Sequence, residues 1–166
     1  SYEYKNPELF IYDTQTRIKR RLTNFAGLDS GANFSADGKW IAYTSSRGDD
    51  TDIFVTNSQG IGKRLLIEGS GLDVDPKFSP DGKQIAFVSG RFGNPHIFVA
   101  TLEKGDGPKV TSDKRLTYAG WYNATPNWSP DSDKIVFAGY DKDINRWDTF
   151  IMNPDGSQLE RLTLKT

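Results

Sequence analysis

One short segment occurs three times in this sequence of 166 residues, and its repetition limits the possible folds more than any other feature. The copies read ANFSADGKWIAYTSSR, PKFSPDGKQIAFVSGR and PNWSPDSDKIVFAGYD. The aromatic residues that precede the turn in each copy, Phe34, Phe78 and Trp128, are 44 and 50 residues apart. Repeats of this length are typical of solenoids and β-propellers, in which each repeat forms one structural unit.

Each copy of the repeat contains four strand-like segments, A to D, which are rich in β-branched and aromatic residues and separated by turn formers. Strands A and B flank the turn, strand C is exemplified by DIFVT, and strand D by KRLL. Strand B is apolar at consecutive positions, as in Ile85 to Val88, whereas a sheet covered on one face would alternate. The pattern predicts an all-β fold, in which four-stranded antiparallel blades stack face to face as a β-propeller.

The repeat divides the chain into about three and a half blades within a single propeller segment, residues 1–166. Strands C and D come first, as a half blade at residues 6–23, and full blades follow at about 29–66, 73–117 and 123–163. Three and a half blades do not close a ring, so apolar sheet faces should be bare at both ends. We expect either that the chain is part of a longer propeller or that copies self-associate through these open faces.

The turn at the centre of the repeat has a structural explanation. Pro80 presets its φ angle, Asp81 can bond nearby backbone amides, and Gly82 can adopt a positive φ where the chain enters strand B. In the third copy Ser132 replaces the glycine, at a cost of about 1 kcal/mol if the left-handed conformation is kept. The alternative is that the turn is rebuilt around Asp133. We interpret the motif as a hairpin turn and not as a catalytic loop.

Charge and composition argue against several classes of function. The chain has 21 Lys and Arg against 22 Asp and Glu, without a run of like charge, which predicts no nucleic-acid partner. No apolar run approaches the roughly 18 residues that a membrane helix needs, so we expect no membrane insertion. Cysteine is absent, and the single histidine, His96, has neither a G-x-S-x-G nor an H-E-x-x-H motif beside it. These observations predict a non-enzyme without cofactor or metal.

In this repeat the chain resembles the TolB propeller family, whose repeat reads roughly PxFSPDGKxIAFxSxRxGxxxIYxxxxxGxxxxRLT. The resemblance extends over nearly the whole chain, including IMNPDGSQLERLT after the third copy. It implies a six-bladed propeller of the periplasmic Tol-Pal envelope system, which binds proteins such as a Pal-like lipoprotein. Propellers of prolyl-oligopeptidase-like hydrolases share the repeat, so the alternative is a regulatory propeller that belongs to such an enzyme.

The loops that differ between repeats supply the candidate partner-binding residues. In a propeller the D-to-A and B-to-C connections lie on one face, which we call the connection face. Aromatic and arginine side chains, the types that dominate protein interface hot spots, are concentrated in these connections. The predicted partner-binding residues are Phe25, Arg47, Arg91, Phe92, Trp121, Tyr122, Tyr140, Arg146 and Trp147. An equally weighted alternative for each aromatic residue is that it only packs its loop onto the adjacent blade.

A second group of candidate residues lies at the mouth of the expected central channel. The equivalent first positions of strand A hold Asp29, Asp73 and Asn123, and Asp75 is close by. A ring of acidic side chains there could attract cations or a basic peptide. The alternative is that these side chains cap turns and bond loop amides.

Overall fold

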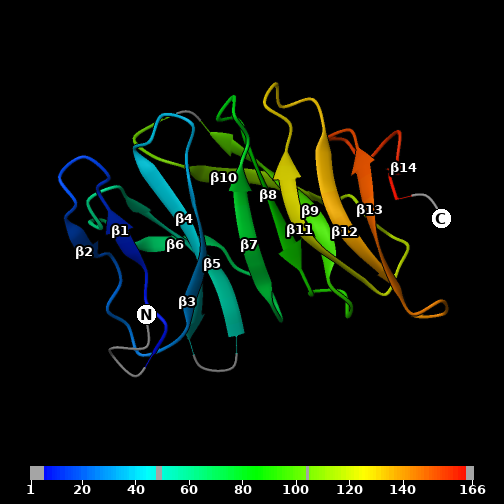
Figure 1. The fold of residues 1–166 in the computed structure, drawn as a ribbon, viewed down its shortest axis with the longest axis horizontal. Helices are drawn as coiled ribbons and strands as arrows, with labels where there is room; N and C mark the ends of the chain where they lie inside the picture. The colour runs from blue at the N-terminus through cyan, green and yellow to red at the C-terminus, as the bar shows by residue number, and fades with distance from the viewer. Residues whose placement is uncertain (1–5, 48–49, 104, 164–166) are drawn as a thin grey trace.

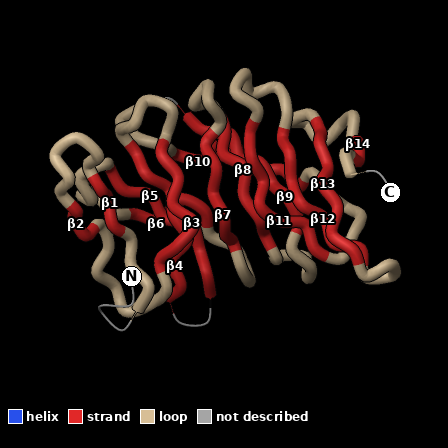
Figure 2. The backbone as a smooth tube through the Cα atoms, in the orientation of Figure 1, coloured by secondary structure: helices blue, strands red, loops and turns tan. Residues whose placement is uncertain are grey.

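The computed structural model describes residues 6–47, 50–103 and 105–163, and these residues form strands, turns and loops but no helix. The strands make one two-stranded and three four-stranded antiparallel sheets (Figure 1). The sheets follow one another along an arch, and the first and last strands lie at opposite ends of it (Figure 2). The predicted all-β architecture of four-stranded blades is confirmed. The described residues include no helix that could cross a membrane.

Each sheet follows the order of the chain, so that every strand pairs with its neighbours in sequence. The half blade consists of β1 (Phe10–Tyr12) and β2 (Lys19–Arg21). Blade 1 consists of β3 (Asp29–Phe34), β4 (Trp40–Arg47), β5 (Asp50–Asn57) and β6 (Arg64–Ile67). Blade 2 consists of β7 (Asp73–Phe78), β8 (Gln84–Ser89), β9 (His96–Glu103) and β10 (Lys109–Arg115). Blade 3 consists of β11 (Tyr122–Trp128), β12 (Ile135–Asp141), β13 (Arg146–Met152) and β14 (Glu160–Arg161).

The repeated turn joins strands A and B as a hairpin, as predicted. In blade 2 the Gly82 amide donates to the Ser79 carbonyl at 2.9 Å, and the Lys83 amide donates to the Asp81 carboxylate at 3.0 Å. Gly82 has a φ of 70°, and Ser132 keeps the same left-handed conformation with a φ of 66°. The third turn is therefore not rebuilt. The Ser132 hydroxyl also accepts a hydrogen bond from the Asp81 amide at 3.0 Å, which links blades 2 and 3.

The core of the molecule lies between the blades and not inside any one of them. Ile53 and Val55 of blade 1 pack with Phe87 and Phe98 of blade 2. The opposite face of blade 2 packs against blade 3 in a second cluster, formed by Val88, Ile97, Val99, Trp128, Ile135, Phe137 and Met152 among others. Blade 2 is thus buried on both faces, which explains the consecutive apolar positions of its strands. Among the described residues, blade 3 packs against another blade on one face only.

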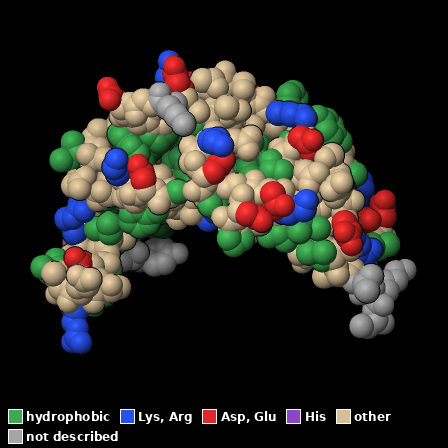
Figure 3. Space-filling model, turned by 90° about the horizontal axis from the view of Figure 1, so that it is seen from above, with side chains coloured by type: hydrophobic (Ala, Val, Ile, Leu, Met, Phe, Trp, Pro, Cys, Tyr) green, Lys and Arg blue, Asp and Glu red, His purple; other side chains and the backbone are tan. Residues whose placement is uncertain are grey.

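The A strands β3, β7 and β11 lie on the concave side of the arch, which Figure 3 shows from above. Hydrogen bonds connect neighbouring A strands: the Phe78 amide donates to the Asn33 side chain, and the Trp128 indole donates to the Lys77 carbonyl, both at 2.8 Å. Each A strand carries a bulge before its last two residues. The non-glycine residues Asp75 and Thr125 adopt positive φ angles of 54° and 51° within these bulges. These contacts fix the spacing of the blades around the concave side.

Candidate functional site

The connection face carries most of the exposed aromatic side chains. In the structure this face is formed by the D-to-A connections 22–28, 68–72 and 116–121 and the B-to-C connections 90–95 and 142–145, with the adjoining strand ends. Seven aromatic residues are exposed among those described. Five of them lie on the connection face: Phe25, Phe92, Tyr118, Trp121 and Trp147. This face therefore offers the side chains that protein interfaces use most.

Three of the predicted binding residues form one aromatic cluster at the end of blade 3. The strand register places Tyr122 opposite Tyr140 and Tyr140 opposite Trp147. The Trp147 ring lies 5.7 Å from the Tyr122 ring and 5.3 Å from the Tyr140 ring, and Trp147 is 52% exposed. Side chains alternate along a strand, and Phe137 faces blade 2, so Tyr140 lies on the uncovered face of blade 3. The cluster is accessible in this structure.

Trp121 lies beside this cluster but makes a separate contact. The Lys142 ammonium group is 4.2 Å from the centre of the Trp121 ring, which is 46% exposed. A cation over an aromatic face is an attractive contact of about 0.5–1 kcal/mol at an exposed site. The pair holds the D-to-A and B-to-C connections of blade 3 together.

Phe25 and Arg47 form a second group, between the half blade and blade 1. The Arg47 guanidinium lies 4.2 Å from the centre of the Phe25 ring and 3.9 Å from that of Phe54. Arg47 is therefore stacked between two rings, while the Phe25 ring keeps an exposed side. The structure does not bring this pair into contact with the aromatic cluster of blade 3.

Arg91 points into the molecule, in contrast to its neighbour Phe92. The Arg91 side chain is 17% exposed and donates hydrogen bonds to the carboxylates of Asp73 and Asp113 and to the Ser89 hydroxyl. Phe92 is 68% exposed and stacks at 6.2 Å on the Phe98 ring. The structure thus occupies Arg91 with internal partners and leaves Phe92 accessible.

Arg146 has an internal partner as well. Its Nε donates to Asp148 at 3.1 Å, and Arg161 donates to the same carboxylate at 3.0 Å. Asp148 is a buried acid that is paired with two arginines. Arg146 is therefore engaged within blade 3 at the edge of the connection face.

The predicted channel-mouth residues occupy equivalent places, opposite Ser45, Ser89 and Gly139 on the B strands. Asp29, Asp73 and Asn123 are all buried. Burial raises the pKa of Asp73, against the opposing effects of the hydrogen bond with Ser89 and the charge of Arg91. Neither carboxylate oxygen of Asp29 has a hydrogen-bond partner among the described residues. Asp75 is half-buried, so it is the acid of this group that solvent reaches.

His96 is buried and held by two side chains. Its Nδ1 lies 3.1 Å from the Thr117 hydroxyl and 3.1 Å from the Asn123 amide nitrogen. The Thr117 hydroxyl already accepts a bond from the Ile97 amide, so it can donate its proton to His96. Burial, with a smaller effect of the Arg115 charge, lowers the pKa of His96 to about 4. The ring is neutral at pH 7 and accepts hydrogen bonds through Nδ1.

The sequence analysis did not assign a role to the recurring RLT at the end of strand D. In the half blade, the Thr23 hydroxyl accepts from the Leu9 amide and donates to Glu8, and Arg21 donates to the Thr23 carbonyl and to Glu8. Blade 3 repeats this arrangement with Asp148, Arg161 and Thr163. These hydrogen bonds link strands C and D. They could have been predicted from the sequence, because an acidic residue precedes strand C and a threonine follows strand D.

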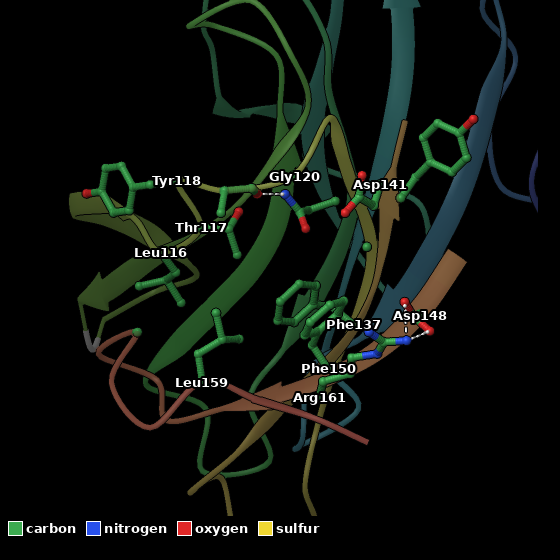
Figure 4. A pocket seen from close by; sticks show the side chains of 15 residues that line it. Leu116, Thr117, Tyr118, Gly120, Phe137, Asp141, Asp148, Phe150, Leu159 and Arg161 are labelled. Carbon is green, nitrogen blue, oxygen red and sulfur yellow. Dashed lines mark hydrogen bonds and ion pairs between the residues drawn. The ribbon is translucent and has the colours of Figure 1, made fainter. Parts of the chain in front are cut away.

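A pocket of about 440 Å³ opens between blades 2 and 3 beside the connection face (Figure 4). Figure 4 shows Phe137 and Phe150 at its centre, with Leu116 and Leu159 to one side and Asp141 to the other. The two phenylalanine rings are stacked with centres 5.5 Å apart. Over residues 6–47, 50–103 and 105–163, no group of three or more His, Asp or Glu side chains is arranged to hold a metal ion.

Comparison with known proteins identifies relatives over the full length of this chain. A family model described as the TolB beta propeller domain matches residues 1–166. TolB from Acinetobacter baumannii is 29% identical and superposes with a TM-score of 0.84 over 98% of this chain and 39% of its own. A putative TolB from Agrobacterium tumefaciens is 27% identical, with a TM-score of 0.82 over 97% of this chain and 58% of its own. The resemblance seen in the repeat is confirmed.

Further findings limit what these matches show about function. A puromycin-hydrolyzing peptidase from Mycobacterium tuberculosis is 16% identical, with a TM-score of 0.69 over 95% of this chain and 27% of its own. At that identity the likeness concerns the propeller fold alone. The chain spans 39% and 58% of the lengths of the two TolB structures. A comparison with the curated proteins finds no match.

Proposed function

The chain belongs to the TolB β-propeller domain family, and from this membership we propose that it is a non-catalytic module that docks another protein through its connection face. The family resemblance supports a periplasmic location. It also supports a Pal-like lipoprotein of the envelope as the partner. Both are properties of whole TolB-type proteins, and this chain spans only part of their length.

The observation that carries the proposal is the concentration of exposed aromatic rings on one edge of the blades. Trp147, Trp121 and Phe92 each expose about half or more of their surface on the connection face. Large aromatic side chains contribute most of the binding free energy in many protein interfaces, because they bury much apolar area with little loss of side-chain entropy. Charged residues lie between them, which is typical of an interface with a polar rim.

The environment of His96 supports a role without catalysis. It is the single histidine of the chain, it is buried, and its Nδ1 already accepts hydrogen bonds from Thr117 and Asn123. A general base needs a free lone pair within reach of a substrate. The likeness to the peptidase propeller concerns the fold, and no contact among the described residues favours hydrolysis over docking.

The proposal can be tested by titrating the chain with the purified soluble domain of a Pal-like lipoprotein in a calorimeter. A triple variant, Phe92→Ala, Trp121→Ala and Trp147→Ala, removes three exposed rings from the connection face. We expect it to weaken binding by a factor of ten or more, since a single hot-spot ring contributes about 2 kcal/mol. The matched control removes three exposed apolar residues from the opposite edge: Tyr12→Ala, Ile18→Ala and Ile61→Ala.

Binding by the parent chain that survives in the control and is lost in the triple variant would support the proposal. An equal loss of affinity in both variants would show that the contact does not lie specifically on the connection face. No heat of binding with the parent chain would reject a Pal-like lipoprotein as its partner.

A further inference from the structure

The three full blades place a pair of aromatic rings at the same position on strands B and C. Tyr43 pairs with Phe54, Phe87 with Phe98, and Phe137 with Phe150. The residue four positions after the strand B ring differs between the blades. It is Arg47 in blade 1 and Arg91 in blade 2, but Asp141 in blade 3.

In blades 1 and 2 this arginine lies over the strand C ring of its own blade. The Arg47 guanidinium is 3.9 Å from the centre of the Phe54 ring. The Arg91 guanidinium is 5.0 Å from the centre of the Phe98 ring, and its nitrogens bond Asp73 and Ser89. In these two blades, therefore, an arginine of the same blade fills the space beside the strand C ring.

Blade 3 has the same ring pair without the arginine, and the space beside it is the pocket of about 440 Å³. Its lining contains the residues equivalent to four of the side chains that Arg91 contacts, although not to the Asp113 carboxylate. Phe137 and Phe150 correspond to Phe87 and Phe98, Asn123 to Asp73, and Gly139 to Ser89. Gly139 widens the space further, because a β-carbon there would lie 2.9 Å from the Phe150 ring.

We propose that this pocket binds an arginine side chain supplied by a partner protein. The guanidinium would stack on Phe150, as Arg91 stacks on Phe98, and its stem would pack along Leu116 and Leu159. Its nitrogens would donate to Asp141 and to the side-chain oxygen of Asn123. This inference rests on the proposed docking function, which it deepens by naming the chemistry of one contact.

The charges and acceptors of the lining favour a cation with several hydrogen-bond donors. Asp148 is already paired with Arg146 and Arg161, so Asp141 is the lining acid that is left without a basic partner among the described residues. The Asn123 amide nitrogen donates to Ala119, which turns the side-chain oxygen towards Gly139. An apolar ligand would give no hydrogen bond to the Asn123 oxygen and no charge partner to Asp141. Lysine has the charge but not the planar group that stacks on a ring.

The test uses Nα-acetylarginine amide as the probe, followed by NMR of the isotopically labelled chain. Nα-acetylcitrulline amide, which has nearly the same shape without the charge, is the control ligand. We expect saturable shifts of the Gly120 and Gly139 amides and the Leu116 methyl groups with arginine, and at least fivefold weaker binding of citrulline. Asp141→Asn should weaken arginine binding by about fivefold.

Two further variants separate the pocket from general electrostatics. Asp141→Arg restores the arginine found in blades 1 and 2, so it should fill the pocket, abolish binding of the probe and raise the melting temperature. Asp143→Arg makes the same charge change two residues away, at an exposed position outside the lining, and should retain binding.

Equal binding of arginine and citrulline would overturn the proposal in favour of a neutral occupant. Shifts that map to Trp121 and Trp147, or loss of binding in both charge variants, would also overturn it. Because the probe is a small molecule, its failure leaves the docking of a whole protein untouched. Failure of the lipoprotein titration would likewise leave the arginine pocket intact.

Discussion

His96 occupies the position that holds Glu8 in the half blade and Asp148 in blade 3. In all three places a threonine hydroxyl at the end of strand D bonds the side chain and the backbone amide that follows it. The carboxylates accept this bond with an arginine beside each of them. The histidine accepts it as a neutral ring, because protonation of Nδ1 would remove its acceptor. The same threonine hydrogen bond is thus accepted by a carboxylate in two places and by a neutral imidazole in the third.

This difference predicts an acid-sensitive contribution to stability. The pKa of His96 is about 4 in the folded chain and about 6.5 when unfolded, so the unfolded chain takes up the proton first as the pH falls. The contribution is complete above pH 6.5 and is lost between pH 6.5 and 4. It amounts to about 3 kcal/mol in the free energy of unfolding. Urea unfolding at pH 7.5, 6.0 and 5.0 would measure it.

His96→Asn provides the control, since asparagine has no charge to gain in this range. Its free energy of unfolding should change less than that of the parent chain between pH 7.5 and 5.0, where most carboxylates remain ionised. Parallel pH profiles of the two proteins would contradict the assigned neutrality of His96.

At the scale of the blade, the contribution of an apolar side chain to the free energy of unfolding depends on whether a neighbouring blade covers the face on which it lies. Val99 on β9 and Ile151 on β13 follow the equivalent residues Phe98 and Phe150. Val99 is buried between blades 2 and 3, whereas Ile151 lies on the uncovered face of blade 3 and is half-buried. The same repeat position therefore belongs to the core in one blade and to the surface in the next.

We expect Val99→Ala to cost about 2 kcal/mol, because it removes buried methyl groups and leaves a cavity. Ile151→Ala removes more carbon atoms but should cost about 1 kcal/mol or less, since Ile151 is only partly buried. Denaturant unfolding of both variants at low protein concentration would compare them. A larger loss for Ile151→Ala than for Val99→Ala would show that the outer face of blade 3 is covered in solution.

The sequence was sufficient to predict the blades because their signals are local. Pro80, Asp81 and Gly82 specify a hairpin by their own backbone preferences, and the consecutive apolar positions of β8 indicate burial on two faces. The partners of Arg91 could not be predicted in the same way. Asp73 and Asp113 lie on different strands, 18 and 22 residues away in sequence. An arginine in a variable loop can point outwards or inwards, and only the packing of the blade decides which.

At the scale of the whole molecule, blade 3 lies at one end of the row of blades (Figure 1), and no other blade of the described residues packs on its outer face. On blade 3 this face contains the half-buried Val136, Ala138 and Ile151 together with the exposed Trp147. The equivalent face of blade 1 is buried against blade 2, and that of blade 2 is buried against blade 3. An apolar face of this kind favours association with another sheet face.

We therefore expect the isolated chain to self-associate. Its apparent mass in sedimentation or light scattering should rise with concentration towards that of two chains. A double variant, Val136→Lys and Ile151→Lys, should remain a monomer over the same range, because buried lysines would oppose contact between the faces. Ile61→Lys and Leu65→Lys add the same charge at exposed positions elsewhere and should associate like the parent chain. A parent chain that stays monomeric at every concentration would contradict this expectation.

The unequal filling of the spaces between blades also has a mechanical consequence. Between blades 1 and 2, Arg91 and its carboxylate partners brace the joint over Phe98. Between blades 2 and 3 the corresponding space is an open pocket, and no side chain of the described residues braces the joint there as Arg91 does. Because this joint has fewer bracing contacts, we expect bending of the arch to be concentrated there and to change the orientation of blade 3. A side chain bound in that joint would restrict the movement between blades 2 and 3, so it would stiffen the arch and fix the orientation of its last blade.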